Sequence, residues 1–306
     1  MKRRNFNEIY QKLSMQKDPN LEGLRQRKTI LGIICVVLIV ILFFGMSAFK
    51  RSDSIPVFTF IMVSSTVIVV VLSLITSAKY RSLYKQSVIN TLVKSYSPDL
   101  YFEQNAGISM MEYDRANYRE FYDSFRSEDL IQGRIDNEFS IKMSEVHTEK
   151  TEYTTDSEGR TQTEHVTVFH GIFGFVLLQD RLFPNFDIST NSFFSKYAKS
   201  RVEVDSSNFE KYYDLYAEDK VRTMEIFTSD LIEEFNHVKD ELKNPIQVKV
   251  DRGILFFRMS MSNAFEAPAF GKALDFDITY RNFKLIDMPA RIVSKILENY
   301  QHAKQD

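Results

Sequence analysis

The side chains best suited to metal or acid–base chemistry in this sequence are its histidines. Three of the five, His147, His165 and His170, share one polar stretch with Glu145 and Glu149. Imidazole and carboxylate groups together can bind zinc or another divalent ion, which a hydrolase could use. They meet only if the strands pair in a suitable register, because a slip of one residue moves a side chain to the other face. A polar, exposed hairpin is therefore the main interpretation, and a metal-dependent hydrolase is an alternative.

The remaining sequence offers no recognisable catalytic motif. It holds no Gly-x-Ser-x-Gly elbow, no phosphate-binding Gly-x-x-x-x-Gly-Lys loop and no Gly-x-Gly-x-x-Gly fingerprint, and only 10 glycines occur. The single cysteine, Cys35, lies inside an apolar run, which excludes a cysteine nucleophile or a cysteine-based metal site in a soluble domain. We predict no catalytic residues and no cofactor, and we favour a non-enzymatic protein.

The histidine stretch belongs to a region, residues 99–306, in which helix and strand signals are mixed. The Thr- and Glu-rich segment around the turn signal Asp156–Gly159 predicts a β-hairpin whose tip reaches into solvent. Further along, the apolar spacing predicts a helix capped by Asp114, a strand at Phe276–Ile286 and a last helix that begins at Asp287. The predicted class is α+β, with a mixed, mainly antiparallel sheet flanked by helices.

Two uncharged apolar runs precede this region. Ile30 to Phe49 and Ile55 to Ala78 are each long enough to cross the hydrocarbon core of a bilayer, which takes about 20 helical residues. These residues predict a membrane-anchoring hairpin of two transmembrane helices within residues 29–78. A basic segment, 1–28, comes before the hairpin, and a juxtamembrane helix, 79–98, follows it.

The charges are distributed unevenly along the chain. Residues 1–98 hold 14 Lys or Arg and 4 Asp or Glu, which leaves 25 and 37 of the totals of 39 and 41 for the remainder. An acidic soluble region of this kind excludes nucleic acid as a partner, because phosphate contacts need cations. Basic residues before the first run and after the second predict cytoplasmic termini. The expected location is the bacterial cytoplasmic (inner) membrane, as a multi-pass protein.

Two phenylalanines lie in a loop rather than at the spacing of a core helix or strand. Phe265 and Phe270 flank Pro268 in the segment 262–275. They are candidate contacts for a protein partner or a lipid tail. The alternative is a loop folded over the edge of the core.

Several short motifs occur in an order that resembles a known family. They are Asp129–Gly133, Phe169–Phe173, Asn185-Phe186, Val202–Val204, Phe209–Lys211, Tyr216–Asp219 and Phe227-Thr228. From about Ser109 to Tyr300 the chain is similar to the bacterial family catalogued as domain of unknown function 3137. The resemblance implies a two-span N-terminal anchor. It implies no activity, ligand or catalytic residue, because none is established for the family.

These observations predict a membrane-anchored cytoplasmic binding or scaffold module. Its partners would be the lipid bilayer, through the two spans, and a protein. A second hypothesis is a lipid-binding module of pleckstrin-homology-like architecture, by analogy with a barrel-like β part followed by a C-terminal helix. The sequence leaves the ligand, the oligomeric state and the strand order open.

Overall fold

The structure is a computed structural model that describes residues 4–16, 18–48, 55–155, 161–178, 180, 182–190 and 200–305. The chain forms two compact units. The helical unit comprises Tyr10–Thr91 and Glu266–Phe276. The sheet unit comprises Met1–Ile9, Leu92–Phe265 and Asp277–Asp306. A loop late in the sequence thus belongs with the N-terminal helices.

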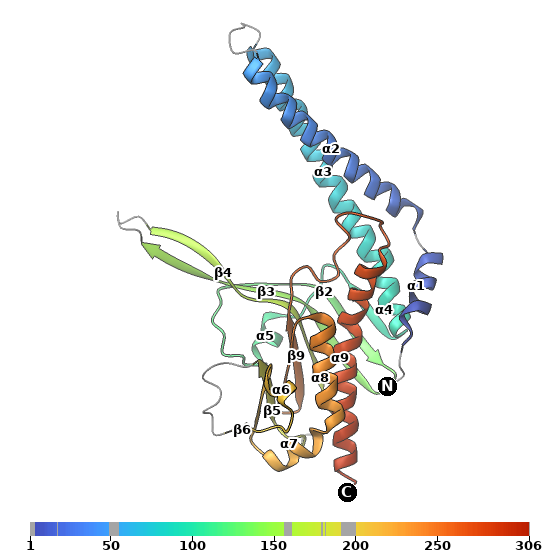
Figure 1. Ribbon diagram of the computed structural model, residues 1–306, viewed down its shortest axis with the longest axis vertical. Coiled ribbons are helices and arrows are strands. Elements are labelled where there is room, and N and C mark those ends of the chain that lie inside the picture. The colour runs from blue at the N-terminus through green and yellow to red at the C-terminus, as the bar shows by residue number, and fades with distance from the viewer. Residues whose placement is uncertain are drawn as a thin grey trace. The chain divides into compact units, whose positions relative to one another are not determined.

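Two long helices make up most of the helical unit, α2 (Pro19–Ala48) and α3 (Ile55–Tyr84), and they pack side by side (Figure 1). Both are long and apolar enough to cross a membrane. α3 continues through a π-helical stretch, η1 (Lys85–Ile89), into α4 (Asn90–Tyr96), and α1 (Phe6–Met15) precedes α2. Phe49, the predicted end of the first span, and residues 50–54 lie outside the described residues.

The sheet unit is built on one nine-stranded sheet with the order β1-β2-β3-β4-β9-β8-β5-β7-β6. All of its described ladders are antiparallel. The sheet is open, with β1 and β6 at its edges, and is not the barrel that the pleckstrin-homology analogy supposed. The strands are β1 (Leu100–Glu103), β2 (Ser124–Ile135), β3 (Phe139–Thr155), β4 (Thr161–Leu177), β5 (Phe186–Thr190), β6 (Arg201–Val202), β7 (Tyr213–Ala217), β8 (Ile246–Asp251) and β9 (Ile254–Ser260).

Helices cover one face of the sheet. α8 (Ser229–Leu242) and α9 (Phe276–Ala303) lie side by side there and are joined by ion pairs between Arg291 and Glu234 and between Lys284 and Glu241 (Figure 1). The shorter helices are α5 (Met110–Asp114), α6 (Ser207–Glu210) and α7 (Lys220–Ile226). The face opposite α9 carries a second apolar cluster, which α5 completes: Ile108, Tyr113, Ala116, Leu130, Val146, Phe169, Phe173, Ile254 and Phe256.

Two of the predicted elements are corrected by the structure. The strand expected at Phe276–Ile286 is the first part of α9, where Thr279, Phe283 and Ile286 are buried on one helical face. Asp287, expected to begin that helix, lies inside it and accepts a hydrogen bond from the Tyr96 hydroxyl at 3.3 Å. The residues from Phe276 to Tyr280 alternate between apolar and polar, as in a strand, but the buried positions of the whole segment follow the spacing of a helix packed on the sheet.

The helix expected after Asp114 is also absent from the described residues. Asp114 is the last residue of α5, whose N-terminus is held by a capping box between Ser109 and Glu112. Asn117 and Arg119 follow with φ values of 49° and 58°. Left-handed backbone at two nearby residues cannot continue a right-handed helix. The segment 115–123 is therefore a loop that crosses the sheet to β2.

The β3–β4 hairpin has an inner part and an outer part. Its inner part is paired on both sides, by β2 as far as Glu149 and by β9 as far as Gly171. A Cβ at Gly171 would lie 2.0 Å from the carbonyl oxygen of Met259, so only glycine allows this approach. The outer part, which we call the arm, is Thr151–Thr155 with Thr161–His165, and it projects beyond the other strands (Figure 1). The predicted turn at Asp156–Gly159 lies outside the described residues.

Candidate functional site

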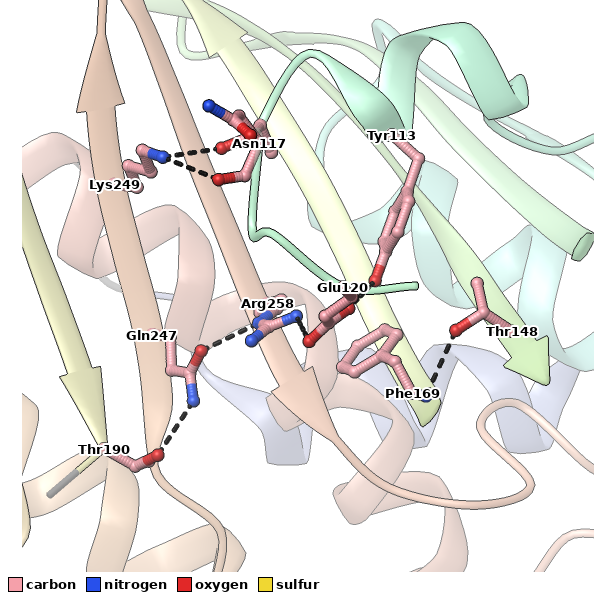
Figure 2. A network of polar contacts seen from close by, with 10 residues as sticks. Tyr113, Asn117, Glu120, Thr148, Phe169, Thr190, Gln247, Lys249 and Arg258 are labelled. Carbon is pink, nitrogen blue, oxygen red and sulfur yellow. Dashed lines mark hydrogen bonds and ion pairs between the residues drawn. The ribbon is translucent and has the colours of Figure 1, made fainter. Parts of the chain in front are cut away.

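A network of polar contacts centres on Arg258, in the middle of the sheet face opposite α9 (Figure 2). Gln247 is its neighbour across the β8–β9 ladder and accepts from Arg258 Nε at 2.7 Å. Glu120 accepts from Arg258 Nη1 at 2.5 Å. Gln247 in turn donates from Nε2 to Thr190 Oγ1 at 3.0 Å. The guanidinium also lies over the ring of Tyr118, with 3.7 Å from its carbon to the ring centroid.

The same network holds the loop 115–123 against the sheet. The Tyr113 hydroxyl donates to Glu120 Oε2 at 2.9 Å, so the carboxylate receives hydrogen bonds at both of its oxygens. Lys249, on β8, donates from Nζ to the carbonyl oxygens of Ala116 and Asn117 at 2.8 and 3.1 Å (Figure 2). A loop with few backbone partners of its own is thereby fixed by side chains from two strands.

Burial determines the protonation states in this network. It raises the pKa of Tyr113 and of Tyr118, against the opposing effect of Arg258. Burial likewise raises the pKa of Asp187, which faces Lys249 across the β5–β8 ladder. The tyrosines therefore stay neutral, and the cations are engaged by Glu120 and by carbonyl groups. The arrangement can position a loop, and it presents neither an activated nucleophile nor a free base.

Two of the three predicted histidines meet at the start of the arm. His147 and His170 are directly opposite in the β3–β4 ladder, with ring centroids 4.4 Å apart in a stacked arrangement. His170 Nε2 lies 2.8 Å from the carboxylate of Glu145, and His147 Nε2 lies 3.6 Å from that of Glu149. His165 pairs with Thr151, further out along the arm.

Both stacked histidines have a lowered pKa. Burial is the largest cause for each, and each ring is further affected by a nearby cation, Arg126 in both cases and the partner histidine in the case of His147. Among the described residues, no group of three or more His, Cys, Asp or Glu side chains is arranged to hold a metal ion. The lowered pKa favours the neutral form of both rings.

A cavity of about 600 Å³ opens where the C-terminal end of α9 meets the sheet. Asp180 lies at its rim and accepts from the Tyr300 hydroxyl at 2.9 Å. Hydrogen bonding to Lys304, to the Leu182 backbone and to Tyr300 lowers the pKa of Asp180 to about 2, so the carboxylate stays ionised. Apolar and charged side chains both line the cavity: Arg134, Glu138, Phe139, Ser140, Val176, Leu177, Leu178, Asp180, Phe183, Leu297, Tyr300, Gln301 and Lys304.

The predicted contact and anchor residues fall in different surroundings. Phe265 is fully buried, whereas Phe270 is 87% exposed, so only Phe270 is available to a partner. Ile30 is exposed on α2, Ile55 begins α3, and Ala78 lies within α3 on its exposed surface.

Residue types and their spacing did not indicate the Arg258 network. The available signal is a charge inside an otherwise apolar run, because Arg258 interrupts Ile254–Met261. A buried cation in a strand needs partners. Those partners, Glu120 and Gln247, are set by the crossing of a loop and by strand pairing, which the local sequence does not reveal.

Comparison with curated proteins and with solved structures gives no match. A family model does match the chain, over residues 167–297. These residues run from Thr167 in β4 to Leu297 in α9, and so include the inner part of β4, β9 and the two helices on the sheet, but not β3. The resemblance that the short motifs indicated is therefore confirmed for this part of the chain, which matches the family described as protein of unknown function (DUF3137).

Proposed function

We propose that this protein is a membrane-anchored interaction module of the bacterial inner membrane, in which α2 and α3 hold the chain in the bilayer and the arm binds a protein partner. The observation that carries the proposal is the arm itself. It is a two-stranded ribbon with unpaired outer edges in the part that the structure describes, on a chain that also has two helices long and apolar enough to cross a membrane.

The exposed surfaces of α2 and α3 support anchoring in lipid. Large apolar side chains face outward on both, among them Phe43 at 72% and Phe60 at 74% exposure. Soluble proteins rarely expose a contiguous apolar surface of this extent. The hydroxyls of Ser65, Thr66 and Thr76 donate to carbonyl oxygens of their own helix at 2.8 to 2.9 Å. Their polar groups are therefore satisfied without water.

The basic residues support cytoplasmic termini, since Lys and Arg are retained on the cytoplasmic side. Eight of them precede the first apolar run, two lie between the runs, and three more follow the second within a few residues. They are Lys2, Arg3, Arg4, Lys12, Lys17, Arg25, Arg27, Lys28, then Lys50 and Arg51, then Lys79, Arg81 and Lys85. On this topology the sheet unit lies in the cytoplasm.

The arm supports a role in protein binding. β9 pairs with β4 only from Gly171 onward, so the edge of β4 from Thr161 to Phe169 has no second neighbour among the described strands. Unpaired strand edges accept an additional strand from a partner, with backbone hydrogen bonds supplying affinity. An isolated two-stranded ribbon is only marginally stable in water, so a partner strand would also stabilise it. Tyr153, 72% exposed on the arm, offers an aromatic contact.

Site-specific photo-crosslinking in membranes tests the proposal. A photoreactive phenylalanine analogue replaces Tyr153 on the arm in one variant and Phe121, 79% exposed on the loop 115–123, in a matched control. We expect a discrete crosslinked product from position 153 in the membrane fraction and none from position 121. Equal products at both positions, or no product at 153 under any growth condition, would count against a binding arm.

A further inference from the structure

The loop in the helical unit carries an exposed apolar tip that the proposed function does not use. This loop, Glu266–Phe276, has a tip at Ala269–Lys272, where all four residues are exposed and Phe270 is 87% exposed. We propose that this tip is a lipid contact, in which Phe270 enters the headgroup region of the bilayer and Lys272 lies near the lipid phosphates. The inference rests on the proposed anchoring of α2 and α3 in a membrane.

Contacts with both long helices hold the base of the tip. The Tyr80 hydroxyl of α3 donates to the carbonyl oxygen of Pro268 at 3.4 Å. The carboxylate of Glu22, on α2, accepts from the backbone N–H of Ala273 at 3.2 Å. Pro268 comes directly before the tip and Ala273 directly after it, and both are buried. The tip is therefore fixed at both ends relative to the two helices.

A third contact reinforces the first side of the loop. Lys85, which is 3% exposed, forms an ion pair with Glu266 at 2.8 Å. A cation at this level of burial holds its partner more firmly than a surface pair does, because solvent screens it less.

The height of these contacts matches the predicted edge of the membrane. Tyr80 is two residues beyond Ala78, the last residue of the second apolar run, which corresponds to about 3 Å along a helix. On α2, Lys28 comes just before the first apolar run, and its Nζ lies 5.3 Å from the centroid of the Tyr80 ring. The end of the second apolar run and the start of the first therefore both lie close to Tyr80, which contacts Pro268. Each headgroup region extends roughly 5 to 8 Å beyond the hydrocarbon core, so the base of the tip, at Pro268, lies within reach of it.

The chemistry of the tip suits a lipid interface. Gly271 has φ +84°, a left-handed conformation that lets the chain turn at the tip without strain. Transfer of an exposed phenylalanine side chain from water to the acyl–headgroup boundary is favourable in free energy. A lysine beside it is attracted to anionic lipid. An apolar residue with a neighbouring cation, held rigidly at the boundary, fits a bilayer containing acidic lipids.

Tryptophan fluorescence tests this directly, because the chain contains no tryptophan. Three single variants of the full chain, Phe270→Trp, Phe43→Trp in α2 and Tyr153→Trp on the arm, are reconstituted into vesicles of phosphatidylcholine and phosphatidylglycerol. Bromine-labelled lipids quench tryptophans that touch lipid. We expect Phe270→Trp to show blue-shifted emission and at least twofold quenching, Phe43→Trp to be quenched as strongly or more, and Tyr153→Trp to stay unquenched.

The controls separate the two proposals. If Phe43→Trp is quenched and Phe270→Trp behaves like Tyr153→Trp, the anchor stands and the lipid contact is overturned. Blue-shifted emission at position 270 without bromine quenching means that protein covers the tip, which also overturns it. If Phe43→Trp is not quenched, the anchoring itself fails and the inference fails with it. Since Phe270 is 87% exposed, its replacement leaves the fold intact.

Discussion

The long helices of the two units have similar lengths and opposite relations to water. α9 has 28 residues and is buried along much of its length, including Phe283, Ile292 and Val293, while exposed positions such as Arg281, Glu298 and Gln301 are polar. α2 and α3 have 30 residues each and expose large apolar side chains along much of their length, although they also pack against each other. A one-sided apolar stripe packs on a protein core, whereas a helix that is apolar on every side needs an apolar solvent. The distribution of apolar residues, more than their number, separates the domain helix from the two helices of the proposed anchor.

The largest expected effect breaks the apolar face of α9. Val293→Asp places a carboxylate at a fully buried position, and we expect the free energy of unfolding to fall by about 4 kcal/mol or more. The measurement is chemical denaturation of the full chain in detergent. Gln301→Asp, at an exposed position of the same helix, should change stability by less than about 0.5 kcal/mol. A similar loss from both would contradict the assignment of faces.

The same kind of change in α2 should have a different consequence. Val40→Arg puts a charge at a position that is 46% exposed, so the sheet unit should keep its fold. Membrane insertion should be disfavoured by about 3 kcal/mol, the cost of an arginine near the centre of a spanning helix. Membrane fractionation measures this, with Val40→Leu as the control. Recovery of the Val40→Arg variant in the membrane fraction at the level of the Val40→Leu control would count against the proposed anchor.

An intermediate effect on stability is expected on the sheet face opposite α9, where Arg258 helps to hold the loop 115–123. Arg258→Ala leaves the Glu120 carboxylate without its 2.5 Å partner, and we expect a loss of about 2 kcal/mol in unfolding free energy. Arg258→Lys keeps the charge but loses the planar geometry, so its loss should be smaller. Denaturation curves distinguish the three proteins. If Arg258→Ala is as stable as the unchanged chain, the network does not hold the loop 115–123.

The smallest effect concerns pH. The folded state holds the pKa of His147 and of His170 below the ordinary value of 6.5, so the unfolded chain binds protons more readily. The contribution of these two histidines to stability is therefore fully present above pH 6.5. It falls as the pH drops from there toward their lowered pKa values in the folded state, and it does not fall further at lower pH. Melting temperatures at pH 7.5 and 5.5 should show this loss, and a His147→Gln, His170→Gln variant should show less of it.

The proposed anchor gives a contrast for the pH experiment. Residues 30–48 and 55–78 contain no Asp, Glu, His, Lys or Arg. Acidification should thus destabilise the sheet unit without releasing the chain from membranes. Release at pH 5.5 would mean that the association depends on titratable groups elsewhere.

The elements that the sequence predicted well depend on local signals. α2 and α3 follow from uninterrupted apolar runs, and β8 follows from the alternation of Ile246, Val248 and Val250, all of which are buried. The residues Phe276 to Tyr280 also alternate between apolar and polar, which suggested a strand. Burial of Thr279 and Phe283 on one helical face shows that packing, a tertiary effect, determined the outcome.

The site was less predictable because its parts come from distant segments. His147 and His170 were candidates, but their pairing could not be counted from the turn. The register of the ladder shifts by one residue between Thr148 and Glu149, which lie between the turn and the histidine pair. The partners of Arg258 depend on a loop whose left-handed residues were not evident from sequence. Phe270 was recognisable as a loop aromatic, but its fixation to both helices was not.

The most direct test of the account is extraction of membranes with alkaline carbonate, which removes peripheral proteins and leaves those that span the bilayer. We expect the full chain to remain in the membrane pellet and to be released only by detergent. Recovery of the chain in the carbonate supernatant would contradict the claim that α2 and α3 cross the membrane, and both proposals would fall with it.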